Sequence, residues 1–119
     1  MIMDKIKEKV AAKQQLSPQE EIALLKSGDV SLIRDCMWSH YLSNEAQIYL
    51  VKSGDVALIR YFIGRDPLVS EAEVELVNLA EPKLLDFYLN KYRIGPRARK
   101  ALLDSGNKVL LRIYHKRRN

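Results

Sequence analysis

The segment Lys26-Ser27-Gly28-Asp29-Val30 returns 26 residues later as Lys52-Ser53-Gly54-Asp55-Val56, and this repetition decides the fold. The segment that follows it, Leu32-Ile33-Arg34, returns in the same frame as Leu58-Ile59-Arg60. The frame continues to the end of the chain, more degenerately and without insertion or deletion. Self-similarity at a fixed period of about 20–50 residues is typical of proteins built from stacked structural repeats. Positions 26 residues apart are called equivalent below.

Each unit has the pattern of two helices joined by a short turn. The first helix, called helix A, starts at a capping-box signature made by Ser17, Pro18 and Glu20. Gly28 can end it in the left-handed conformation, and Asp29 can cap the second helix, called helix B. The apolar positions of helix B recur at the spacing of one buried helical face. We expect helicity to break near Gly28, Gly54, Ala80 and Gly106.

These patterns predict an all-α fold in one domain, an α-solenoid of four helical hairpins preceded by one N-terminal capping helix, with about nine helices. The capping helix falls in residues 1–15, and the hairpins fall in residues 16–41, 42–67, 68–93 and 94–119. Because packed helices lie about 8–10 Å apart, four units should extend roughly 40 Å.

The chain resembles the α-helical repeat families, namely HEAT-like arrays and the wholly helical leucine-rich-repeat variants. The resemblance covers residues 16–119 and rests on Ser-Pro-x-Glu, Lys-Ser-Gly-Asp-Val and Leu-Ile-Arg. It implies a role in interaction or recognition. It transfers no site, because no residue matches a functional position of a named family.

Composition and charge narrow the class of protein. The single cysteine excludes an internal disulfide and fits a reducing compartment. No apolar run is long enough to span a bilayer, and the N-terminus lacks the apolar core of a signal peptide. We therefore expect a cytoplasmic protein that does not associate with membranes. The net charge is +5, yet residues 94–119 alone carry +7.

No catalytic, cofactor or metal motif is recognisable, so we expect neither an enzyme nor a bound cofactor or metal. Cys36 and His40 lie one helical turn apart, but two ligands are too few for a closed zinc site. Cys36 is equivalent to Phe62 and Tyr88, which predicts a buried thiol in the core.

Acidic residues gather near the starts of the A helices, as Glu20-Glu21 and as Glu71-Glu73-Glu75. Ser70 and Glu73 have the spacing of a second capping box. Carboxylates are favourable at the positive end of a helix dipole, so we assign these residues a structural role.

Two aromatic residues are candidates for contact with a partner. Trp38 points away from the apolar stripe of its helix, in a slot held elsewhere by Gly64, Asn90 and Lys116. It is either a contact anchor or is covered by the N-terminal helix or an adjoining loop. Tyr49 lies on the outward face of its A helix, where a single exposed tyrosine is common.

Arginine recurs at one equivalent position, as Arg34, Arg60 and Arg112, with Asp86 interrupting the series. Such a ladder could bind an extended acidic partner or a phosphate backbone. Alternatively, it forms a solvated flank whose stems shield the core and pair with nearby acids.

The last unit carries a basic cluster that is opposed only by Asp104. It suggests either a nucleic-acid-binding patch or a charged cap that keeps the stack soluble. The members are Arg97, Arg99, Lys100, Lys108, Arg112, Lys116, Arg117 and Arg118.

The function that these features favour is that of a non-catalytic binding or scaffold protein. Its partner is expected to be another protein, bound through an extended face of the stack. The alternative is a nucleic-acid-binding repeat protein that uses the basic last unit.

Overall fold

The computed structural model describes residues 2–117, and all its regular structure within that range is helical. This confirms the predicted all-α fold. The N-terminal helix is α1 (Ile2–Ala11). The four hairpins are α2 (Pro18–Ser27) with α3 (Val30–Ser39), α4 (Asn44–Ser53) with α5 (Val56–Ile63), α6 (Ser70–Leu79) with α7 (Pro82–Lys91), and α8 (Pro96–Asp104) with α9 (Lys108–Arg117).

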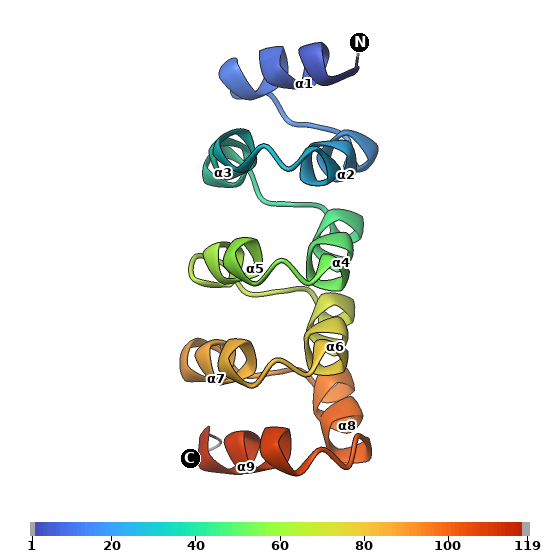
Figure 1. The fold of residues 1–119 in the computed structure, drawn as a ribbon, viewed down its shortest axis with the longest axis vertical. Coiled ribbons are helices and arrows are strands. Elements are labelled where there is room, and N and C mark those ends of the chain that lie inside the picture. Colours follow the sequence, from blue (N-terminus) through green and yellow to red (C-terminus); the bar gives the residue numbers. More distant parts are fainter. Residues whose placement is uncertain (1, 118–119) are drawn as a thin grey trace.

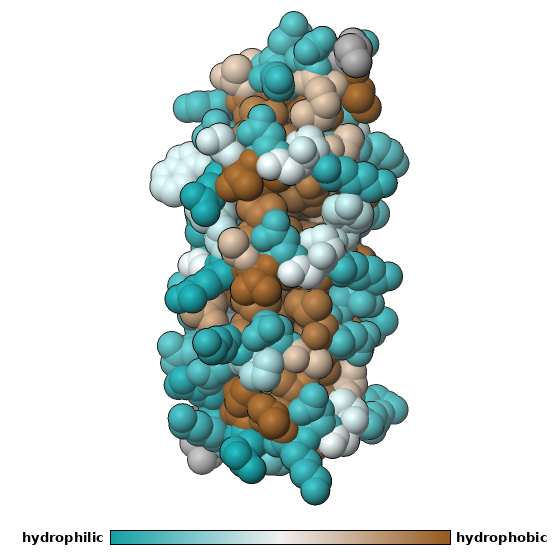
Figure 2. Space-filling view, in the orientation of Figure 1, coloured by the Kyte–Doolittle hydropathy of each residue, from teal (hydrophilic) through white to brown (hydrophobic). Residues whose placement is uncertain are grey.

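The hairpins stack in one direction, so that the A helices (α2, α4, α6, α8) form one column and the B helices (α3, α5, α7, α9) form another (Figure 1). α1 packs against both α2 and α3. The molecule measures 46 × 21 × 20 Å, close to the length expected from the number of units. Apolar side chains form an interrupted band between the columns on the face of Figure 2, with hydrophilic side chains on both flanks.

The turn between the two helices of a unit is built as its sequence predicts. Gly28 and Gly54 each adopt φ +75° at the end of helix A. The Asp29 and Asp55 carboxylates then accept hydrogen bonds from the backbone N–H groups at the start of helix B. The third unit keeps this turn without glycine, because Ala80 takes the left-handed conformation at φ +56°.

The core runs along the whole stack between the two columns. Cys36, Phe62 and Tyr88, which are equivalent, are 2 %, 3 % and 0 % exposed. The predicted core position is therefore confirmed. Burial raises the pKa of the Cys36 thiol to about 11, so the thiol stays protonated and unreactive at neutral pH.

A buried polar side chain on each of the first three A helices binds the backbone that leads into the next unit. Glu21 Oε1 accepts from Ser43 N at 3.1 Å. Gln47 Oε1 accepts from Val69 N at 2.8 Å. The third of these contacts joins Glu73 Oε1 to Gly95 N at 2.9 Å. We call these three equivalent side chains the linker clasps.

The linker clasps correct the interpretation of the acidic residues. Glu20 does complete the capping box with Ser17. The second capping box is wrong, because α6 has Val69 at its N-cap with no side-chain cap and Ser70 is already helical. Glu73 turns into the core instead, where its Oε2 accepts a hydrogen bond of 2.6 Å from the Tyr88 hydroxyl.

Candidate binding surfaces

Charge is divided between the two columns. The helices α3, α5, α7 and α9 together contain eight Lys or Arg residues and two Asp. By contrast, α2, α4 and α6 contain two Lys and six Glu, of which Glu21 and Glu73 are buried. Counting charge unit by unit along the chain hides this division, because the A and B helices of one unit partly cancel. The last A helix, α8, is an exception, with three cations and one Asp. Along the first three units, the B column is therefore the basic side of the molecule.

Two members of the predicted arginine ladder lie on aromatic rings of the following unit. The Arg34 guanidinium lies 5.1 Å from the centre of the Tyr61 ring, and both residues are on B helices. Arg60 lies in the same way over Phe87, at 4.8 Å. Of the two alternatives for the ladder, the solvated flank named nearby acids as the partners of these arginines; the contacts observed for Arg34 and Arg60 are cation–π contacts between neighbouring units.

The ladder does not continue to the last unit. Asp86 takes the next equivalent position and binds Arg117, with oxygen–nitrogen distances of 2.7 and 3.3 Å. This ion pair lowers the pKa of the Asp86 carboxyl. Arg112 is exposed on α9, but Asp86 lies between it and Arg60 in the series, so the three arginines do not form one continuous ladder.

Trp38 is 70 % exposed, so the alternative in which α1 or a loop covers it is wrong. The Arg65 guanidinium lies 4.1 Å from the centre of its ring, and Arg65 also donates to the Met37 carbonyl at 3.4 Å. An uncovered tryptophan with an arginine on one face is an unusual feature for a surface that binds nothing.

The Trp38–Arg65 contact belongs to a series in which a cation reaches back to the preceding unit. Lys91 Nζ donates to the Gly64 carbonyl at 2.8 Å, and Arg117 donates to the Asn90 side chain at 3.1 Å. In each case the two residues are 27 positions apart, as are Arg34 and Tyr61. The cations also lie near helix C-termini, where positive charge is favourable.

Tyr49 lies in the other column and does not join Trp38 in one site. Its ring is partly buried, and Lys26 Nζ lies 5.6 Å from its centre. It is therefore a second, separate aromatic–cation pair, on the A column.

A shallow hollow of about 300 Å³ lies on the B column between the second and fourth units. It extends from Arg60 and Phe87 to Arg117, with Lys83, Asp86 and Asn90 completing its lining. Three of these six side chains are cationic and one is acidic, so the hollow continues the basic character of the column.

The structure divides the predicted basic cluster of the last unit between two helices. Arg97 lies 3.9 Å from Glu71, and Lys100 lies 3.4 Å from Asp104. Both pairs are exposed, and Arg117 is bound to Asp86 as described above. Lys108, Arg112 and Lys116 are exposed on α9, while Arg118 lies outside the described residues. The described members of the cluster are therefore divided between α8 and α9.

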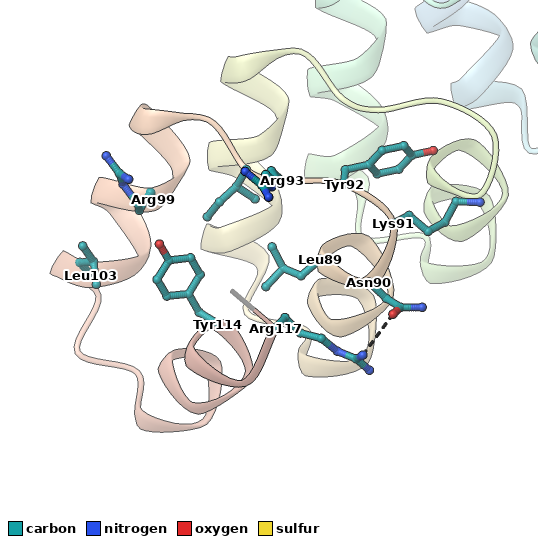
Figure 3. Close-up of a pocket in the computed structure, with 10 residues that line it drawn as sticks. Leu89, Asn90, Lys91, Tyr92, Arg93, Arg99, Leu103, Tyr114 and Arg117 are labelled. Atoms are coloured by element: carbon teal, nitrogen blue, oxygen red, sulfur yellow. Dashed lines mark hydrogen bonds between the residues drawn. The ribbon is translucent and has the colours of Figure 1, made fainter. Parts of the chain in front are cut away.

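A larger pocket of about 780 Å³ opens between α7, α8 and α9 (Figure 3). α8 contributes Arg99 and Leu103, and α9 contributes Tyr114 and Arg117. Arg99 is equivalent to Glu21, Gln47 and Glu73, the linker clasps. The remaining lining residues are Leu89, Asn90, Lys91, Tyr92, Arg93 and Ile94.

Within residues 2–117, no group of three or more His, Cys, Asp or Glu side chains is arranged to hold a metal ion. His40 Nε2 lies 2.7 Å from the Lys13 carbonyl and therefore donates to it, which ties α3 to the turn after α1. None of the helices in the described part of the chain has the length and apolarity needed to cross a membrane.

The fold and its surfaces define an all-helical, repeat-like protein. The sequence matches no protein-family model, and comparison with curated proteins and with solved structures finds no significant similarity.

Sequence reasoning missed the ring partners Tyr61 and Phe87, the cation Arg65, and the linker clasps. Each of these three residues contacts a side chain 27 positions earlier in the chain, which is one position more than the repeat period. A search at the repeat period alone compares equivalent positions and cannot find contacts at that offset.

Proposed function

We propose that this protein is a non-catalytic binding module that holds an extended acidic segment of another protein along the outer face of the B column. The observation that carries the proposal is the uncovered Trp38 beside Arg65, on a face where Arg34 and Arg60 are held against rings. Tryptophan and arginine are the residues that most often dominate protein–protein binding energy.

The ring contacts prepare the arginines for carboxylates. A guanidinium that lies on a ring has lost part of its side-chain freedom before binding, which reduces the entropy cost of association. A guanidinium stacked on a ring keeps its N–H edge available, and that edge can bind a carboxylate through two parallel hydrogen bonds. Since stacked helices are about 10 Å apart and an extended chain rises about 3.3 Å per residue, successive arginines match carboxylates three residues apart.

The nucleic-acid alternative has weaker support. Single-stranded nucleic acids bind by stacking bases on aromatic rings, and one face each of Tyr61, Phe87 and Trp38 already carries a guanidinium. The basic residues of the last unit are also divided between two helices, and Arg117 is engaged by Asp86. We therefore propose a protein partner.

Fluorescence anisotropy can test the proposal with a labelled peptide of repeated Glu-Pro-Val and a matched peptide of repeated Gln-Pro-Val. The glutamate peptide should bind more tightly, and Trp38→Ala should weaken its binding by about thirtyfold, the loss of one anchor. Arg60→Ala should also weaken it. Tyr49→Ala is the matched control, because it removes an aromatic–cation pair from the opposite column.

Equal binding of the two peptides, or an equal loss in Tyr49→Ala and Trp38→Ala, would contradict the proposal. A labelled oligothymidylate supplies the comparison with nucleic acid. Three results together would favour the nucleic-acid alternative. The oligothymidylate would bind more tightly than the glutamate peptide, its binding would fall steeply with salt, and charge reversal of Arg97, Arg99 and Lys100 would abolish that binding.

A further inference from the structure

The pocket between α7, α8 and α9 corresponds to a site on the preceding hairpin that is filled by the linker to the next unit. We call this site, which is formed by the two helices of a hairpin, the seat of that unit. There, the backbone from Tyr92 to Gly95 crosses the end of the hairpin formed by α6 and α7. Gly95 N donates to Glu73, and the Tyr92 ring lies 5.0 Å from the Tyr88 ring. The pocket residues Ile94, Arg99, Leu103 and Tyr114 are equivalent to Leu68, Glu73, Val77 and Tyr88.

The exposure of equivalent residues shows that the last seat is built but open. Val77 is 3 % exposed, whereas its equivalent Leu103 is 50 % exposed. Tyr88 is fully buried, whereas Tyr114 is only partly buried. The apolar and aromatic side chains that hold a linker in the third unit are thus present in the fourth, around a cavity of about 780 Å³.

The side chain at the linker-clasp position is a hydrogen-bond acceptor in the first three units and a donor in the fourth. In the first three units, Glu21, Gln47 and Glu73 accept a backbone N–H from the segment in the seat. Arg99 can only donate. Among the described residues that line the pocket, four are cationic and none is acidic: Lys91, Arg93, Arg99 and Arg117.

From this we infer that the pocket between α7, α8 and α9 is a peptide-binding site for an extended segment that carries an apolar side chain followed by a carboxylate. The apolar side chain takes the place that Leu68 or Ile94 takes in the stack, against Leu103 and Tyr114. The carboxylate binds Arg99, which lines the pocket and, unlike its three buried equivalents, is exposed. Arg99 is exposed, so water can satisfy its donors, and the preference for a carboxylate comes from its charge among the cations that line the pocket.

A second copy of this chain is a poor occupant. The other end of the stack is α1, a helix and not an extended segment, and it carries three Lys against Asp4 and Glu8. This end therefore does not offer the negative charge that would complement the cationic pocket. Charge complementarity therefore selects an acidic peptide.

The test uses two labelled peptides that differ in one group, acetyl-Tyr-Pro-Leu-Asp-Ser-amide and acetyl-Tyr-Pro-Leu-Asn-Ser-amide, and the whole chain. The aspartate peptide should bind about tenfold more tightly, the value of one charge-assisted hydrogen bond. Arg99→Gln recreates the Gln47 clasp, so it should abolish this preference and improve binding of the asparagine peptide. Lys100→Gln is the matched control, because Lys100 is also on α8 but does not line the pocket.

The site of binding separates this inference from the proposed function, on which it does not rest. In a ¹H–¹⁵N NMR spectrum, the aspartate peptide should shift the amides of Leu103 and Tyr114 and leave the Trp38 indole N–H unchanged. Three results would overturn the inference: shifts at Trp38 alone, equal affinity for both peptides, or a dimer in sedimentation equilibrium that Arg99→Gln dissociates.

Discussion

The three linker clasps, Glu21, Gln47 and Glu73, each use one side-chain oxygen to accept a backbone N–H. They differ in the partner of the other polar atom of the side chain. Gln47 Nε2 donates to the Leu42 carbonyl at 2.9 Å. The second oxygen of Glu73 accepts from Tyr88. Within the described residues, the second oxygen of Glu21 is buried without a hydrogen-bond partner. Burial therefore raises the pKa of the Glu21 carboxyl, although hydrogen bonds from Ser43 oppose the shift.

At this position, Glu21→Gln should raise the free energy of unfolding at pH 7 by about 1 kcal/mol. The amide removes a buried charge and can donate to the Leu16 carbonyl, as Gln47 donates to the equivalent Leu42. Urea unfolding followed by circular dichroism measures the change. Glu8→Gln, an exposed change on α1, is the control and should alter stability little.

The pH dependence of the stability difference between Glu21→Gln and the unchanged protein shows whether the buried charge of Glu21 causes that difference. A raised carboxyl pKa means that the native state binds its proton more tightly than the unfolded chain does. The contribution of Glu21 to stability therefore falls as pH rises from the ordinary value near 4.5 through the raised pKa. The advantage of Glu21→Gln should grow over that window and be smallest below it. An advantage that does not change between pH 4 and pH 8 would assign the effect to packing.

At the scale of the helix, the turn between helices A and B depends on a left-handed residue. Gly28, Gly54 and Gly106 adopt φ between +66° and +75°, and Ala80 adopts +56°. In the third unit the helix after this turn, α7, starts with Pro82, whose fixed φ suits the first turn of a helix. Its alanine carries a steric cost that glycine avoids.

Two substitutions at equivalent positions should have opposite effects. Ala80→Gly should stabilise the protein by about 0.5–1 kcal/mol, since relief of the left-handed strain exceeds the entropy cost of glycine. Gly28→Ala should destabilise it by about 1 kcal/mol, because no atom lies within 4 Å of the added Cβ and only backbone strain changes. Thermal unfolding measures the stability change in each variant. If both substitutions stabilise the protein, or both destabilise it, the explanation by left-handed strain is refuted.

At the scale of the whole molecule, the helix–helix contacts within residues 2–117 join neighbouring units only. Each A helix packs on the next A helix, each B helix packs on the next B helix, and α1 packs on the first hairpin. Stability in such an array is close to a sum over units and their interfaces, so the ends should be less protected than the middle. The side-chain contacts 27 positions apart add to the interfaces of the B column.

Native-state hydrogen exchange should show this gradient. Amides of α4 and α6, which have a neighbour on both sides, should exchange most slowly, and those of α1 and α9 should exchange fastest. Mass spectrometry of peptic fragments resolves the helices. Equal protection from α1 to α9 would instead indicate that the stack unfolds as one cooperative unit.

The sequence by itself determined the repeat period, the all-helical fold, the hairpin turns and the core. Capping residues, left-handed glycines and the spacing of apolar residues act within a few positions of the chain, so their signals are local. The burial of Cys36 followed from its equivalence to Phe62 and Tyr88.

Only the tertiary structure decided which side chains meet across units. The rotation of each helix about its axis and the stacking of neighbours turned Glu21 and Glu73 inward, placed Arg34 on Tyr61, and left Trp38 uncovered. The same packing gathered cations on the B column and left the seat at Arg99 open. These outcomes depend on contacts between residues more than 20 positions apart, which local spacing and charge counts along the chain do not encode.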